Sequence, residues 1–124
     1  NVAEASRALG GDPNEPGALS EIGSRLSDLL AGTTVLITQG AEGMTLFRDG
    51  REGLHLPAVA RHVYDVTGAG DTVVGVLALA LAAGAPIEAA VSLANRAAGV
   101  VVGKLGTATV ANLELLDELV RSTG

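Results

Sequence analysis

Residues 65–76, DVTGAGDTVVGV, place small residues and a carboxylate at the start of an apolar run. The pattern predicts a buried helix whose first turn contains Gly68, Ala69, Gly70 and Asp71. The first N–H groups of a helix lack intrahelical acceptors and lie at the positive end of its dipole, so they can bind an anion. Small residues let a phosphate approach closely. An ionised Asp71 could then accept the proton of an attacking hydroxyl during phosphoryl transfer.

Two common phosphate-loop motifs do not fit this segment. The pattern G-x-G-x-x-G fails because Val73 stands at the third glycine, and G-x-x-x-x-G-K-[ST] fails because no lysine follows. Residues 99–105, GVVVGKL, imitate the second motif with a spacing one residue short and no terminal hydroxyl. A structural alternative remains open: Thr67 caps the helix, Asp71 complements the dipole, and the glycines permit tight packing.

Periodicity and turn residues predict an α/β fold. Helices are expected at residues 1–9, 18–32, 68–83, 86–102 and 112–122, and strands at 33–38, 44–48, 51–58 and 62–66. The two middle strands would form a hairpin around Asp49-Gly50. In the second helix the apolar face is expected to contain Leu19, Ile22, Leu26, Leu29 and Leu30. Because four strands are few for helices this apolar, we expect part of the sheet to be missing or supplied from elsewhere.

Composition excludes several classes of protein. The net charge of −6 argues against a general nucleic-acid binder, and the absence of cysteine excludes disulfides and thiolate chemistry. The longest uncharged apolar stretch, residues 73–87, contains Gly84 and Pro86 and is too short to span a membrane. We therefore expect a cytoplasmic protein without a signal peptide and without nucleic-acid or membrane partners.

Four segments resemble the motifs of the PfkB family, the ribokinase-like carbohydrate kinases. DVTGAGDT is similar to the family signature D-T-x-G-A-G-D, although Val66 stands where many members have threonine. NVAEA resembles the N-x-x-E motif, TQGAEGMTLF the nucleotide-binding strand and turn, and ANRAAGVVVGKLGTATV the late helix and cation loop. Within the family, the chain most resembles the heptose 7-phosphate kinase domain of bifunctional ADP-heptose synthases.

The resemblance implies a ribokinase-like three-layer α/β/α sandwich, with residues 1–124 as the C-terminal, nucleotide-side portion of a single kinase domain. It implies transfer of phosphate from MgATP to a sugar hydroxyl, the acceptor being D-glycero-D-manno-heptose 7-phosphate and the product the 1,7-bisphosphate. ATP or ADP and the sugar phosphate are the implied partners, and Mg²⁺ and K⁺ the implied ions. Uncovered apolar helix surface also predicts homo-oligomerisation.

The resemblance also implies roles for individual residues. Asp71 matches the catalytic base, and the backbone of Gly68, Ala69 and Gly70 matches the anion hole. The residues that match nucleotide contacts are Asn1, Glu4, Thr38, Gly40, Gly43 and Asn95. The residues that match metal contacts are Glu4, near Mg²⁺, and Asp65, Thr67, Gly106 and Thr109, around a monovalent cation.

Each secondary assignment has a simpler alternative. Asn1 and Glu4 could be a helix cap with a solvated acid. The polar stripe that contains Asn95, at 88, 92, 95 and 96, could be a solvated helix face. No other candidate metal ligands accompany His55 and His62 in the sequence pattern. Both are expected to be ordinary strand or loop residues.

The function also has alternatives. The family's domain is more than twice this length, and its sugar-binding residues and lid lie outside this sequence. The chain could therefore belong to another PfkB-family sugar or nucleoside kinase, or be a catalytically inactive nucleotide-binding fragment. A nucleotidyltransferase is not supported, because the sequence contains no H-x-G-H motif.

Overall fold

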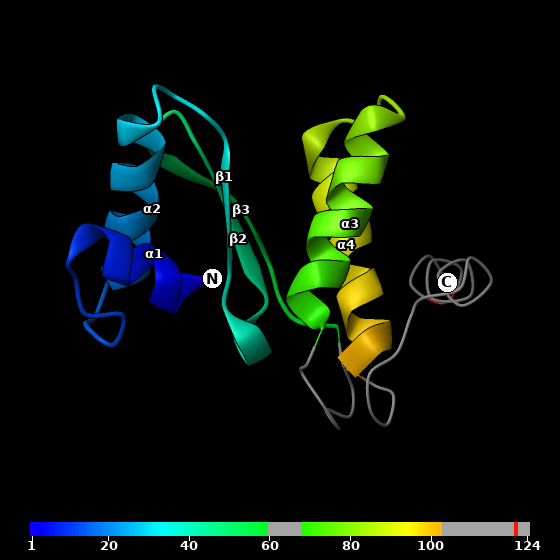
Figure 1. Cartoon of the computed structure of the whole chain (residues 1–124), viewed down its shortest axis with the longest axis horizontal. Coiled ribbons are helices and arrows are strands. Elements are labelled where there is room, and N and C mark those ends of the chain that lie inside the picture. Colours follow the sequence, from blue (N-terminus) through cyan, green and yellow to red (C-terminus); the bar gives the residue numbers. More distant parts are fainter. Residues whose placement is uncertain (60–67, 103–120, 122–124) are drawn as a thin grey trace. The chain divides into compact units, whose positions relative to one another are not determined.

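The structure is a computed structural model that describes residues 1–59, 68–102 and 121 (Figure 1). The chain divides into two compact units, Asn1–Pro57 and Ala58–Gly124, and each is described separately. The elements of the first unit are α1 (Val2–Leu9), α2 (Ala18–Leu29), β1 (Val35–Thr38), the 3₁₀ turn η1 (Gly40–Glu42), β2 (Met44–Arg48) and β3 (Arg51–Leu56). Those of the second are α3 (Ala69–Ala82) and α4 (Ile87–Val102).

Glycines end the helices of the first unit as the sequence predicts. Gly10 follows α1 with φ 71°, in the left-handed conformation that glycine adopts without steric cost. The second helix is shorter than expected, because the chain leaves it through left-handed Ala31 and Gly32. Leu29 and Leu30 therefore lie at its end and are 69% and 52% exposed, so these two leucines of the predicted apolar face are not buried.

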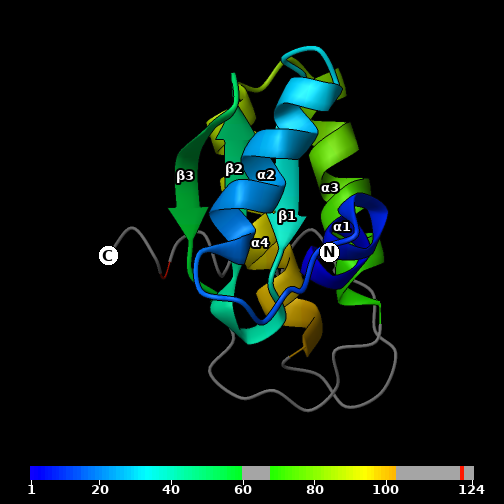
Figure 2. The same ribbon diagram turned by 90° about the vertical axis from the view of Figure 1, so that its left-hand side faces the viewer.

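The three strands form an antiparallel sheet in the order β1-β2-β3, and α1 and α2 cover one of its faces (Figure 2). The core on this face contains Ala18 and Ile22 of α2, Ile37 of β1 and Phe47 of β2. Gly23 permits this packing, because a Cβ at that position would overlap the Phe47 ring. The predicted hairpin is confirmed, with both turn residues, Asp49 and Gly50, at positive φ.

The opposite face of the sheet is also apolar. Strand register places Leu36 opposite Leu46, Leu46 opposite Leu54, and Met44 opposite Leu56. Met44 and Leu46 are both buried. A sheet that is apolar on both faces is typical of the middle layer of an α/β fold.

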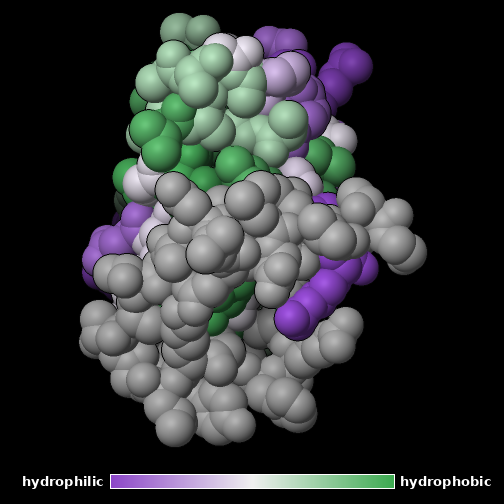
Figure 3. All heavy atoms as spheres, turned by 90° about the vertical axis from the view of Figure 1, so that its right-hand side faces the viewer, coloured by the Kyte–Doolittle hydropathy of each residue, from purple (hydrophilic) through white to green (hydrophobic). Residues whose placement is uncertain are grey.

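The described part of the second unit is a helical hairpin, and its two helices keep their predicted bounds to within one residue. Gly84, with φ 88°, follows α3, and Pro86 directly precedes α4. Whereas α4 buries seven residues, α3 buries only Val73 and exposes Val74, Leu79 and Leu81. Hydrophobic side chains accordingly form much of the described surface in Figure 3. Among the described residues, no helix has both the length and the apolar character needed to cross a bilayer.

Two predicted elements, the strand at 62–66 and the helix at 112–122, lie outside the described residues except for Arg121.

Candidate functional site

The first turn of α3 has no side-chain cap. Its N-cap is Gly68, with φ 83°, and this N-cap makes no side-chain hydrogen bond to the turn. The Thr72 N–H donates to the Gly68 carbonyl at 3.0 Å, which begins the helical hydrogen-bond series. The N-cap is thus Gly68 and not Thr67, so that part of the structural alternative is wrong. The first N–H groups of a helix lack intrahelical acceptors, so those of this turn are suited to a ligand or solvent.

The space around this turn is open. A Cβ built on Gly68 or Gly70 would meet no atom within 4 Å. Tight packing therefore does not explain either glycine, and only Gly68 needs glycine for its positive φ. Gly70 has neither constraint, and its small size leaves the backbone accessible to an anion.

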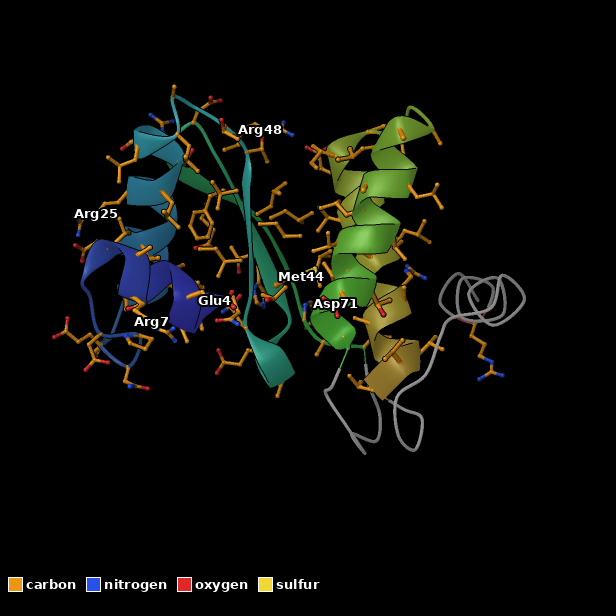
Figure 4. All side chains as sticks on the ribbon, in the orientation of Figure 1. Glu4, Arg7, Arg25, Met44, Arg48 and Asp71 are labelled. Atoms are coloured by element: carbon orange, nitrogen blue, oxygen red, sulfur yellow. The ribbon has the colours of Figure 1, made fainter. Side chains whose placement is uncertain are left out.

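Asp71 lies in this same first turn and is exposed (Figure 4). The helix dipole favours a negative charge at this end. A carboxylate that neighbours a set of available N–H groups can accept a proton while those groups hold a phosphoryl oxygen. The geometry fits the chemistry that the sequence pattern suggested.

The first turn of α1 is closed by its own side chains. Asn1 Oδ1 accepts a hydrogen bond from the Glu4 N–H at 3.0 Å, and Glu4 Oε2 accepts one from the Asn1 amino group at 2.7 Å. This is a capping box. In the 124-residue chain, where Asn1 carries a free ammonium, its hydrogen bond and charge lower the pKa of the Glu4 carboxyl below its ordinary value.

A tight turn joins β1 to β2. Thr38 ends β1, and Gly40 and Gly43 both have positive φ, at 61° and 96°. The Gln39 N–H donates to the Gly43 carbonyl at 2.8 Å, and the Gly43 N–H donates to the Gly40 carbonyl at 3.1 Å. In the views of Figures 1 and 2, α1 begins close to the end of β1 that carries this turn.

Asn95 is buried on α4, where only 6% of its surface is exposed. Glu88 of the same predicted stripe is exposed, whereas Ser92 and Arg96 are half-buried. The interpretation of the stripe as a solvated face is therefore wrong for Asn95. Asn95 also takes part in an interaction within the structure.

The predicted site residues that the structure describes are divided between the two units. The first unit holds Asn1, Glu4, Thr38, Gly40 and Gly43, and the second holds Gly68, Ala69, Gly70, Asp71 and Asn95. Asp65, Thr67, Gly106 and Thr109 lie outside the described residues. Across residues 1–59, 68–102 and 121, no three acidic or histidine side chains gather as a metal cluster.

Sequence reasoning missed one polar cluster in the first unit. The Thr45 hydroxyl lies 2.6 Å from Gln39 Oε1 and 2.8 Å from His55 Nδ1. His55 is a strand residue, as expected, but it is not isolated. The signal that could have found the pair was the predicted hairpin, which sets the two strands side by side.

Comparison with known proteins identifies the class. The sequence profile of the pfkB family carbohydrate kinases matches residues 1–114. The structure of Arabidopsis thaliana ribokinase complexed with ribose and ATP superposes with a TM-score of 0.84 and 28% identity, covering 96% of this chain and 39% of that one. Escherichia coli phosphofructokinase-2 in complex with potassium gives a TM-score of 0.84 at 17% identity, covering 98% of this chain and 39% of that one, and supports the fold alone.

The fold is therefore the ribokinase-like α/β fold, and the chain belongs to the pfkB family of carbohydrate kinases. Among curated relatives, the bifunctional protein HldE of Azotobacter vinelandii is 52% identical over the whole chain, and that of Pseudomonas aeruginosa is 49% identical. The chain spans only 26% of the length of each.

Proposed function

We propose that this chain is the C-terminal, nucleotide-side portion of a sugar kinase domain that transfers phosphate from MgATP to a sugar hydroxyl. The observation that carries the proposal is the uncapped, open first turn of α3 with Asp71 in it. Membership of the pfkB family supports the reaction class. The sequence identities of 52% and 49% to proteins named HldE support heptose 7-phosphate as the acceptor. The product would be the 1,7-bisphosphate.

In the proposed reaction, the acceptor hydroxyl attacks the γ-phosphorus and its proton passes to the Asp71 carboxylate. A bond forms from the acceptor oxygen to phosphorus, the bond from phosphorus to the bridging oxygen breaks, and ADP leaves. The N–H groups of residues 68–70 stabilise the charge on the transferring oxygens. Because this transition state is loose, the main requirement on Asp71 is its position.

The remaining residues would hold the nucleotide and its ions. Thr38, Gly40 and Gly43 would contact the nucleotide through the turn, Asn95 would contribute a buried amide, and Asn1 and Glu4 would lie near the phosphates. Mg²⁺ in such sites is held by one or two carboxylates together with phosphates and water, and it neutralises developing charge on the phosphates. A single exposed carboxylate, that of Glu4, fits this requirement.

Asp71→Asn in the complete protein that contains this chain tests the proposal. The variant keeps the size of the side chain and removes the proton acceptor, so kcat should fall about 10²–10⁴-fold with little change in nucleotide affinity. Asp49→Asn is the matched control, because Asp49 is exposed in the hairpin turn and asparagine tolerates its positive φ. Near-normal turnover by Asp71→Asn would reject the assignment.

The acceptor is tested separately by supplying MgATP with heptose 7-phosphate, fructose phosphates, ribose and nucleosides. We expect the highest kcat/KM with heptose 7-phosphate. A preference for another sugar would retain the kinase assignment and change the substrate.

We also propose that K⁺ binds between Asp65, Thr67 and the loop that contains Gly106 and Thr109. Replacing K⁺ with a bulky organic cation at constant ionic strength should lower activity. An unchanged rate would contradict the proposed K⁺ site.

A further inference from the structure

The Thr45 hydroxyl occupies a buried position between two polar side chains. Thr45 has no exposed surface, and its hydroxyl lies 2.6 Å from Gln39 Oε1 and 2.8 Å from His55 Nδ1. A hydroxyl has one hydrogen, which it donates to Gln39 Oε1. The second contact must then run the other way, with the His55 Nδ1–H donating to Thr45. The three groups form a directed chain, His55 to Thr45 to Gln39.

Gln39 is the residue from which the β1–β2 turn begins. Its N–H donates to the Gly43 carbonyl at 2.8 Å, and its carbonyl accepts from the Glu42 N–H at 3.3 Å. Although Gln39 is the N-cap of η1, its side chain does not cap that turn. The side chain contacts Thr45 instead, so the turn is held by its own backbone and by this anchor to the sheet.

A bulge in β3 creates the contact with His55. Near the hairpin turn, Phe47 pairs with Glu52, and a regular continuation would set Leu54 opposite Thr45. The register instead shifts between Leu46 and Phe47, and Thr45 pairs with His55. One extra residue thus brings an imidazole to the face that carries Thr45.

We propose that Thr45 and His55 are positioning residues for nucleotide binding, which they support by fixing Gln39 and hence the turn at Gly40–Gly43. This inference rests on the proposed function, in which that turn contacts the nucleotide. Replacing Thr45 by valine preserves shape but leaves Gln39 Oε1 and the His55 N–H without their partner. The turn would then sample other conformations, and only a fraction of molecules would be competent to bind.

The test measures the Kd for MgADP and the KM values for ATP and sugar in the complete protein. Thr45→Val and His55→Ala should each raise the nucleotide Kd and KM about tenfold, with kcat and the sugar KM nearly unchanged. Thr45→Ser, which restores the hydroxyl, should return both constants toward wild type. His55→Ala removes an exposed side chain, so it remains informative if Thr45→Val fails to fold.

Ser27→Ala is the matched control. Ser27 is also fully buried and its hydroxyl also has two partners, the Thr33 carbonyl and the Gly50 N–H, but these lie at the hairpin end of the sheet. It should lose stability without a change in nucleotide affinity. If wild type binds MgADP and the Thr45 and His55 variants bind it equally well, or if Ser27→Ala weakens binding as much, the positioning role is overturned. If wild type binds no nucleotide, the proposed function itself fails.

Discussion

The first turns of α1 and α3 both match phosphate-end motifs of the family, yet their structures differ. In α1 the side chains of Asn1 and Glu4 satisfy the turn through a capping box. In α3 the N-cap is Gly68, which has no side chain to offer, and the turn is uncapped. A helix start that is stabilised by its own side chains does not need a ligand, whereas an uncapped one gains from binding an anion. We therefore propose that the anion site lies at α3 and not at α1.

The largest expected effect is the absence of catalysis in the isolated chain, although that chain contains both helix starts. The 124-residue chain alone should show no detectable kinase activity and at best weak nucleotide binding, because the acceptor has no positioning groups. Positioning supplies about 7–11 kcal/mol of a barrier. The measurement is turnover of MgATP with heptose 7-phosphate, together with the mass in solution, since uncovered apolar surface on α3 favours self-association. Turnover by a monodisperse monomer would contradict this prediction.

A second prediction separates activity from stability at α3. In Gly70→Ala a methyl group enters open space, and alanine favours the helix, so the free energy of unfolding should rise by about 0.5–1 kcal/mol. The same methyl group crowds the anion site, and kcat/KM should fall at least about tenfold, or 1.4 kcal/mol. Urea unfolding of the complete protein checks the expected rise in stability, and its steady-state kinetics check the expected fall in kcat/KM. Unchanged activity would mean that no anion approaches here.

A third prediction concerns the cap of α1. Asn1→Ala should lower the free energy of unfolding by about 1 kcal/mol, whereas Asn1→Ser should keep most of it. If Asn1 acts only as a cap, both variants should keep the wild-type KM for ATP, and only the apparent kcat should fall with the fraction of folded protein. A raised ATP KM in Asn1→Ser, despite retained stability, would instead assign its amide a ligand role.

The smallest expected effect is the pH dependence of Glu4. The Asn1 ammonium lowers the pKa of this exposed carboxyl from 4.5 in the folded chain. Its contribution to stability is therefore present above about pH 4.5 and is lost as pH falls through the lower folded pKa. In the 124-residue chain with a free amino group on Asn1, Glu4→Gln should lower the urea midpoint at pH 6 and have a smaller effect at pH 3. Equal effects at both pH values would contradict the assignment.

Much of the local structure was predictable because short-range signals determine it. Gly10 and Gly84 end helices, Pro86 precedes one, and Asp49-Gly50 forms the hairpin turn, as the sequence indicated. The small residues before Asp71 also indicated the start of α3, where we propose the anion site. The N-cap of α3 was misplaced by one residue, because both Thr67 and Gly68 are suitable types and only backbone conformation distinguishes them.

The sequence by itself determined the helix ends, the hairpin and the carboxylate at the start of α3, because these depend on residues close together in the chain. Only tertiary structure decided that His55 lies opposite Thr45, since one bulge residue changes which side chain shares the face of Thr45. Tertiary structure also decided that Asn95 is buried and that Leu29 is exposed. Periodicity shows which residues share a helix face, but burial depends on what packs against that face and where the helix stops.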